Sequence, residues 1–274
     1  MEKVFVREIF AKSILSRSGI IGVDYAINPY LGCSHGCVYC YARLYTAKFW
    51  EKLAEDHEWG NFVFPKVNAT QLLRKELKKK RNGLILLSSV TDPYLPQEST
   101  YKLTRRILEV LREYRFPISI LTKSPLVIRD LDIISKLEDV EVGFSISGLD
   151  SFWLSHFEPR APSVKSRLAA LRRLSEEGIR TYAFISPILP GITDRCLDPL
   201  FKKIKEANPD RIMVDLLRIR PRLWQFIKQA VEKALPDYLQ VYNKIRFDLS
   251  YFFDIKGRFE EVAAKYGYEL EWMY

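Results

Sequence analysis

Short apolar runs alternate with longer amphipathic segments along most of the chain, which is the pattern of an α/β fold. Strands of a parallel sheet that is covered on both faces are expected to be almost continuously apolar. Five runs have this character: residues 84–90, 117–123, 141–147, 181–188 and 211–217. A first strand is expected at residues 25–30, so the pattern predicts six parallel strands.

The segments between these runs are expected to be helices. Asn68 is predicted to cap the first of them, with Gln71 three residues later in the spacing of a capping box. Ser163 is predicted to cap another helix, which Gly178 would end. A helix between these two carries its apolar positions at helical spacing, at Leu103, Ile107, Val110, Leu111 and Tyr114.

Six β/α units with right-handed crossovers can form a partial barrel or a doubly wound sheet, because both share this local pattern. A loop with three cysteines follows the first strand, and its position favours the barrel. We therefore expect a partial (β/α)6 TIM-like barrel over residues 1–235. From about residue 236 the alternation fades. Residues 236–274 are predicted to form an aromatic-rich C-terminal extension packed on the barrel.

The composition limits the class of protein and its partners. The chain has 274 residues, with 43 Lys and Arg against 34 Asp and Glu, and a formal net charge of +9. This balance favours an anionic partner such as nucleic acid, although a thermophilic type of charged surface gives the same excess with no dedicated partner. No apolar run reaches transmembrane length, and the start of the chain does not read as a signal peptide. We expect a soluble, cytoplasmic protein without a membrane partner.

Three of the 4 cysteines, Cys33, Cys37 and Cys40, have the spacing C-x3-C-x2-C on one loop. Three thiolates this close can hold a [4Fe–4S] cluster, which normally takes four cysteines, and one iron is then left to bind a small molecule. The competing interpretation is a structural zinc site with His35 as fourth ligand. All four candidates lie within eight consecutive positions, where a short loop would struggle to turn every side chain onto one ion. The motif resembles that of the radical S-adenosylmethionine (SAM) superfamily.

Other segments narrow the resemblance to the spore photoproduct lyase-like branch of that superfamily, often described as DNA repair photolyase-like. They are NPYLGCSHGC (28–37), TDPY (91–94) followed by Glu98, LTKS (121–124), FEPRAP (157–162) and PILPGI (187–192). Together they span residues 24–194. The cysteine motif is specific for the superfamily, and the other segments indicate the branch.

The resemblance implies that Cys33, Cys37 and Cys40 bind the [4Fe–4S] cluster. It further implies that Tyr39 lies against the adenine of SAM. Tyr41 matches a tyrosine that assists radical return in the lyase. Reductive cleavage of SAM would give a 5′-deoxyadenosyl radical that removes hydrogen from the substrate, and the hard chemistry would belong to the cofactors.

Polar side chains at the ends of the predicted strands offer contacts for SAM, as the carboxyl ends of barrel strands do for ligands in general. By the resemblance, Asp92 with Ser89 or Thr91 would receive the amino group of SAM, and Lys123 and Ser145 would hold its other polar ends. Each has an ordinary alternative. Asp92 could simply start a turn, Lys123 could be a solvated lysine, and Ser145 could bond another serine.

Two further charged features lie near strand ends. Glu158 and Arg160 put one negative and one positive side chain in the loop after the fourth strand. Asp215 interrupts an apolar run, and its ordinary explanation is pairing with Arg218 or Arg220.

One departure from the lyase concerns its hydrogen-donating cysteine, which the resemblance would place close to the second-strand SAM motif. This sequence has Leu87, Ser88 and Ser89 there. The remaining thiol is Cys196, in the loop after the fifth strand. Cys196 could donate hydrogen, or it could be a small buried apolar side chain. A single spare cysteine cannot hold an auxiliary cluster.

Three functions remain open at this point. The first is a radical SAM enzyme acting on a nucleic-acid or nucleotide-derived substrate. The second keeps the radical chemistry but acts on a peptide or small metabolite, and the third is a zinc-stabilised nucleic-acid-binding module. Both enzyme interpretations need a one-electron donor, for which a ferredoxin or flavodoxin is the usual type.

Overall fold

The computed structural model describes residues 3–44 and 57–273, and its centre is a curved sheet of eight strands. The strand order is β11-β10-β9-β8-β7-β6-β3-β2. Every pairing from β3 to β11 is parallel, whereas β2 runs antiparallel to β3. The strands are β2 (Leu15–Arg17), β3 (Tyr25–Ile27), β6 (Ile85–Leu87), β7 (Ile118–Thr122), β8 (Val140–Ser145), β9 (Arg180–Ile188), β10 (Arg211–Leu216) and β11 (Leu270–Trp272).

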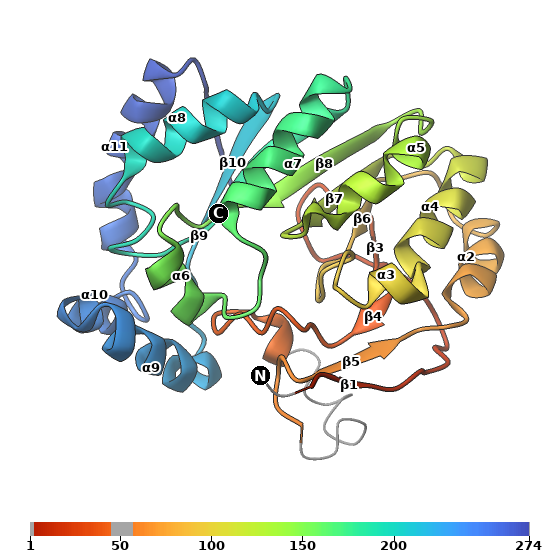
Figure 1. The fold of residues 1–274 in the computed structure, drawn as a ribbon, viewed down its shortest axis with the longest axis horizontal. Coiled ribbons are helices and arrows are strands. Elements are labelled where there is room, and N and C mark those ends of the chain that lie inside the picture. Colours follow the sequence, from red (N-terminus) through yellow and green to blue (C-terminus); the bar gives the residue numbers. More distant parts are fainter. Residues whose placement is uncertain (1–2, 45–56, 274) are drawn as a thin grey trace.

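The six predicted strands correspond to β3 and β6 to β10, each within a few residues of the expected bounds. Among the described residues, β2 and β11 are unpaired edges, so the sheet curves without closing. The expected partial barrel is therefore confirmed. Helices line the outside of the curve (Figure 1). They include α2 (Ala69–Leu77), α4 (Leu103–Tyr114), α5 (Leu131–Ile134), α7 (Val164–Glu176) and α8 (Leu197–Ala207).

A smaller sheet holds the start of the cysteine loop. Its strands are β1 (Phe5–Val6), β5 (Phe62–Pro65) and β4 (Tyr30–Leu31), in the order β1-β5-β4. After β4 the chain crosses the carboxyl end of the large sheet towards α6 (Ser151–Phe157) and α9 (Trp224–Ala234) (Figure 1). The cysteines therefore lie at the carboxyl ends of the parallel strands, as the sequence predicts.

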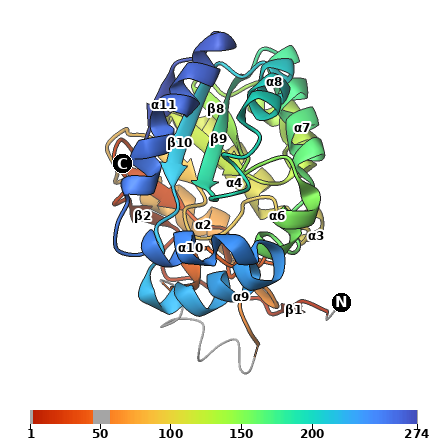
Figure 2. The same ribbon diagram turned by 90° about the vertical axis from the view of Figure 1, so that its left-hand side faces the viewer.

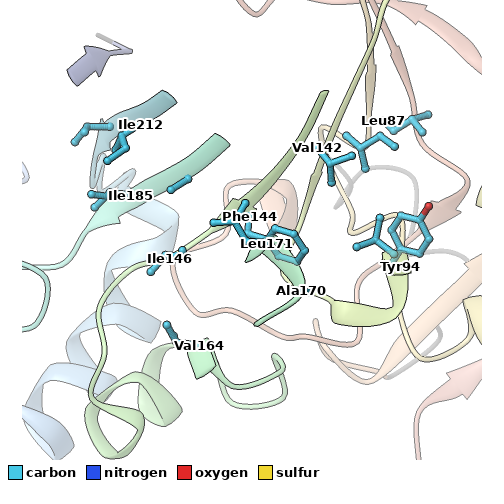
Figure 3. Packing of buried hydrophobic residues seen from close by; sticks show 14 of the residues in the cluster. Leu87, Tyr94, Val142, Phe144, Ile146, Val164, Ala170, Leu171, Ile185 and Ile212 are labelled. Atoms are coloured by element: carbon cyan, nitrogen blue, oxygen red, sulfur yellow. The ribbon is translucent and has the colours of Figure 1, made fainter. Parts of the chain in front are cut away.

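The core consists of strand side chains that are buried on both faces of the sheet. Leu87, Val142, Phe144, Ile185 and Ile212 are fully buried, and Figure 3 shows how such residues meet the apolar face of α7. Parallel strands between two covered faces lose nearly all their solvent contact, which accounts for the continuous apolar runs. Burying each of these side chains contributes about 1.5–3 kcal/mol.

The helix caps are only partly as expected. The Ser163 hydroxyl accepts a hydrogen bond from Ser166 N at 3.2 Å, and Gly178 ends that helical segment with a positive φ of 73°. The expectation for Asn68 is wrong, because its side chain makes no cap hydrogen bond. Its side-chain amide instead accepts a hydrogen bond from Ala11 N and donates one to Ala11 O, both at 2.9 Å. These bonds satisfy the two backbone polar groups of Ala11 in the N-terminal segment.

The C-terminal residues contain three helices and the last strand of the large sheet. These elements are α9, α10 (Leu239–Lys244) and α11 (Ser250–Lys265), followed by β11. The carboxyl ends of β9 and β10 point towards α9 and α10 (Figure 2). Strand β11 pairs with β10, a contact that the sequence did not predict, and the boundary at residue 235 stays a prediction. Short helical turns complete the fold: α3 (Glu98–Tyr101), η1 (Pro125–Asp130), η2 (Pro221–Leu223) and η3 (Pro236–Tyr238).

None of the described helices has both the length and the hydropathy needed to cross a bilayer.

Gly143 in β8 is required by close packing rather than by backbone conformation. A Cβ at this position would lie 2.1 Å from the ring of Tyr182 on the neighbouring strand. We expect Gly143→Ala to lower the free energy of unfolding by about 1–3 kcal/mol, because the ring must move. Urea unfolding monitored by circular dichroism measures this change.

Gly257→Ala is the matched control, since no atom lies within 4 Å of the added carbon and the site is in the middle of α11. Removing a helical glycine should raise stability by about 0.5–1 kcal/mol. A Gly143→Ala protein as stable as the wild type would contradict the described packing of β8 against β9.

Candidate functional site

The cysteine loop is shaped by Gly32 and by backbone hydrogen bonds within the loop and to the end of α6. Gly32 has a φ of 83°, and a Cβ there would lie 2.6 Å from the carbonyl oxygen of Phe62, so only glycine fits. Within the loop, Cys40 N donates to Cys37 O at 3.2 Å. Val38 N donates to Phe157 O at 2.9 Å, which fixes the loop against α6.

All three loop cysteines are free thiols, of which Cys33 and Cys37 are buried and Cys40 is partly buried. Burial raises the pKa of each thiol, to about 12 for Cys37 and well above the usual value for Cys33. For Cys33, the neighbouring Asp92, Cys37 and Cys40 raise the pKa further, so the three sulfurs are close enough to interact. Without a bound cation the thiols therefore keep their protons, and a metal centre would have to displace them.

The donor set fits a cluster better than a single ion. No group of three or more His, Cys, Asp or Glu side chains in the described residues is placed to hold one metal ion. The zinc site of three cysteines with His35 is thus not preformed, since such a site needs four ligands within bonding distance of one centre. A four-iron cluster spaces its thiolates more widely, and three free thiols on one loop, two of them buried, suit it.

Asp92 connects the cysteine loop with the ends of β6 and β7. One carboxylate oxygen accepts from Tyr94 N at 2.8 Å and Thr122 Oγ1 at 2.7 Å, and the other accepts from Lys123 N at 2.8 Å. His35 Nδ1 lies 3.6 Å from the second oxygen. The bond to Tyr94 N is the turn that the sequence offered as the ordinary explanation, and Asp92 is also close enough to Cys33 to raise the pKa of its thiol.

Ser89 and Thr91 lie where the segment after β6 meets the cysteine loop. The Thr91 hydroxyl donates to Gly32 O at 2.6 Å, and the Tyr41 hydroxyl donates to the carbonyl of Ser89. Asn28 Oδ1 accepts from Ser89 N at 3.0 Å, while its amide donates to Ser89 Oγ at 3.2 Å. The structure thus brings Ser89, Thr91 and Tyr41 together, and it ties both ends of the loop to this segment.

A buried charge cluster after β8 was only partly foreseen. Glu158 accepts hydrogen bonds from the Tyr39 hydroxyl, from Arg167 and, at 3.3 Å, from Ser147 Oγ. Lys123 Nζ lies 4.0 Å from the same carboxylate. The sequence singled out Glu158, Tyr39 and Lys123 separately, whereas Arg167 was missed.

The pKa of Glu158 reflects these partners. Burial alone would raise it, but Arg167 and Lys123, together with the hydrogen bonds from Arg167 and Tyr39, outweigh burial and lower the pKa to about 2. Burial would lower the pKa of Arg167, yet Glu158 raises it above the usual value. Both groups therefore stay charged, and the cluster is a true buried ion pair.

The remaining expected residues are less closely connected. Ser145 ends β8, and its carbonyl accepts from Arg167 Nη1 at 2.9 Å. Cys196 is exposed and precedes α8, at the end of the loop after β9, so the alternative of a buried apolar side chain is wrong. Asp215 pairs with Arg218 at 3.5 Å, which is the ordinary explanation offered above.

Comparison with known proteins places this arrangement in a family. The sequence profile described as "Radical SAM superfamily" matches residues 27–204. Among curated relatives, the uncharacterized protein MJ0683 of Methanocaldococcus jannaschii is 41% identical over 192 residues, which is 70% of this chain and 71% of the relative. A relative named radical SAM Nalpha-GlyT isomerase, from Pseudomonas phage M6, is 26% identical over 68% of this chain and 38% of its own length.

Solved structures give the same fold. Spore photoproduct lyase complexed with dinucleoside spore photoproduct aligns with a TM-score of 0.68 at 17% identity, over 98% of this chain and 82% of the lyase. SuiB of Streptococcus suis bound to S-adenosylmethionine aligns with a TM-score of 0.59 at 14% identity, over 90% of this chain and 49% of SuiB. At these identities the likeness concerns the fold, while the match over residues 27–204 identifies the family. The chain belongs to the radical SAM superfamily of enzymes.

Proposed function

We propose that this enzyme binds a [4Fe–4S] cluster through Cys33, Cys37 and Cys40 and acts on a nucleic-acid or nucleotide-derived substrate, in the manner of the spore photoproduct lyase-like branch. The observation that carries the proposal is a set of three free thiols on one loop at the carboxyl end of the sheet, of which Cys33 and Cys37 are buried and Cys40 is partly buried. When bound, the cluster would supply the electron that splits SAM into methionine and a 5′-deoxyadenosyl radical, which removes hydrogen from the substrate.

The surrounding side chains would hold SAM at this end of the sheet. The ammonium of Lys123 lies 4.0 Å from the carboxylate of Glu158, among the polar groups at this end of the sheet. Its positive charge would attract the carboxylate of SAM. Tyr39 would lie against the adenine, and Ser145 would hold another polar end. Asp92 already accepts three hydrogen bonds from the protein. The amino group of SAM would therefore donate both to the remaining lone pairs of Asp92 and to the hydroxyl of Ser89 or Thr91.

Two residues would act later, on the substrate radical. Tyr41 follows the last cysteine, and its hydroxyl is fixed to the carbonyl of Ser89, beside the proposed SAM contacts. This position supports a role in radical return. Cys196 is exposed in the loop after β9, on the same side of the sheet, and would be the hydrogen donor if the reaction needs a thiol.

The net charge of +9 and the likeness to a lyase that holds a dinucleoside photoproduct support the nucleic-acid substrate. A peptide substrate is the second candidate, because SuiB bound to its precursor peptide SuiA aligns over 76% of this chain with a TM-score of 0.50. Radical SAM enzymes need a reductant, and we propose a ferredoxin or flavodoxin in the cytoplasm.

Cys37→Ala should abolish both the cluster and the formation of 5′-deoxyadenosine, because two thiolates leave two irons without a protein ligand. The measurements are iron and sulfide content after anaerobic reconstitution, and chromatography of the nucleoside after incubation with SAM and dithionite. Cys196→Ala, which removes the thiol outside the loop, should keep the iron and sulfide of the wild type. Persistence of 5′-deoxyadenosine in Cys37→Ala would contradict the assignment of the loop.

A nucleic-acid substrate predicts salt-dependent binding. Affinity for a DNA or tRNA oligonucleotide should fall by about 10³ or more when salt rises about fourfold, if six or more phosphates are neutralised, and by less for fewer contacts. Fluorescence anisotropy over a salt series measures the slope. Binding that is absent or insensitive to salt would instead favour the peptide or small-metabolite substrate.

A further inference from the structure

Glu158 is a buried carboxylate whose two oxygens are both engaged. One oxygen accepts from the Tyr39 hydroxyl and from Ser147 Oγ at 3.3 Å, and Lys123 Nζ lies 4.0 Å away from it. The other oxygen accepts from Arg167. The side chain of Glu158 is 2% exposed, so its charge is compensated by protein groups rather than by water. One carboxylate thus connects a residue of the cysteine motif with the ends of β7 and β8.

Arg167 holds this carboxylate in a fixed position. Its side chain is also 2% exposed, and its guanidinium donates to three acceptors on different segments. Nε donates to Pro162 O at 2.9 Å, Nη1 donates to Ser145 O at 2.9 Å, and Nη2 donates to Glu158. A planar guanidinium with three fixed acceptors has little freedom to rotate. The position of Glu158 is therefore set by α7 and by the end of β8.

Stability alone is a weak reason to bury such a pair. Desolvating two charges costs several kcal/mol each, and apolar side chains of the same volume often serve the fold equally well. An apolar pair, however, could neither accept a hydrogen bond from the Tyr39 hydroxyl nor attract the Lys123 ammonium. Lys123 Nζ also lies 5.9 Å from the centroid of the Tyr39 ring, so these two groups lie on the same side of the Glu158 carboxylate.

We propose that Glu158 and Arg167 are positioning residues for SAM, which fix the Tyr39 ring and the Lys123 ammonium in the orientation that the cofactor requires. The inference rests on the proposed function, since both positioned groups are proposed SAM contacts. Tyr39 lies between two ligand cysteines, where a free ring would have several rotamers. The hydrogen bond to Glu158 selects one of them before SAM arrives, which reduces the entropy lost on binding.

The test measures SAM affinity in the cluster-loaded protein. Tyr39→Phe removes the hydroxyl that donates to Glu158 and keeps an aromatic ring at this position, free to adopt other rotamers. We expect it to keep wild-type iron and sulfide and to bind SAM about tenfold more weakly. In uncoupled cleavage to 5′-deoxyadenosine, KM for SAM should rise about tenfold, while kcat at saturating SAM stays near the wild-type value. Isothermal titration with SAM gives the affinity directly.

Tyr182→Phe is the matched control. It also removes a buried tyrosine hydroxyl, which is hydrogen-bonded to Ser119 Oγ at 3.1 Å, but in the first part of β9, far along the strand from its carboxyl end. SAM affinity in this variant should equal that of the wild type. A loss of affinity shared by both variants would attribute the effect to general loosening and overturn the proposal.

A double-mutant cycle separates positioning from simple support of the fold. The pair Glu158→Met with Arg167→Met removes both buried charges together and leaves no acceptor for the Tyr39 hydroxyl. If the pair acts through Tyr39, adding Tyr39→Phe to it should weaken SAM binding no further. Additive losses, or a Tyr39→Phe protein that binds SAM as tightly as the wild type, would overturn the inference. Where the paired variant loses its cluster, the comparison of Tyr39→Phe with Tyr182→Phe decides alone. Failure of the wild type to bind SAM would appear before any variant is compared, and would overturn the proposed function itself.

Discussion

Near each end of the cysteine loop a tyrosine donates a hydrogen bond to a buried glutamate. The geometry of the site depends on these two tyrosine–glutamate hydrogen bonds. Before the first cysteine, the Tyr30 hydroxyl donates to the fully buried Glu98, which also pairs with Arg129 at 2.8 Å. Before the last cysteine, Tyr39 donates to Glu158, which pairs with Arg167. The loop between them has little regular structure of its own, so it depends on tertiary hydrogen bonds for its shape.

The two glutamates differ in the groups that surround them. Glu98 also accepts from the backbone of Thr104 at 3.0 Å, and its partners other than Tyr30 lie in α4 and η1. Around Glu158 a single carboxylate faces two cations, because Arg167 binds one oxygen and the ammonium of Lys123 lies 4.0 Å from the other. The same Tyr–Glu–Arg chemistry thus fixes the scaffold on one side and leaves a cation available on the other. An anionic group of a ligand would complete the charge balance there.

The strands and the cysteine motif could be predicted from sequence because their signals are local. Continuous apolar runs mark β6 to β10, and three cysteines within eight positions mark the site. The Asn68 cap failed because a contact 57 residues away competes for the same side chain. The bond between Tyr39 and Glu158 spans 119 residues, and no local pattern encodes it. Arg167 did leave a signal, since it lies on the apolar face of α7 with Leu171 and Leu174, where a charge needs a partner.

The segment after β6 sets this chain apart from the lyase whose fold it shares. Where the resemblance would place a hydrogen-donating cysteine, the chain has Leu87, Ser88 and Ser89. Ser88 is buried, has a positive φ of 70° and leaves its hydroxyl without a hydrogen-bond partner among the described residues. A serine cannot replace a thiol in that step, because an aliphatic O–H bond is far stronger than an S–H bond. Hydrogen return, if the reaction includes it, therefore requires another donor such as Cys196 or 5′-deoxyadenosine itself. The three cysteines of the loop and Tyr41 match the pattern of the lyase, whereas the segment after β6 has no cysteine. This difference favours a related substrate with a different final step over repair of the same photoproduct.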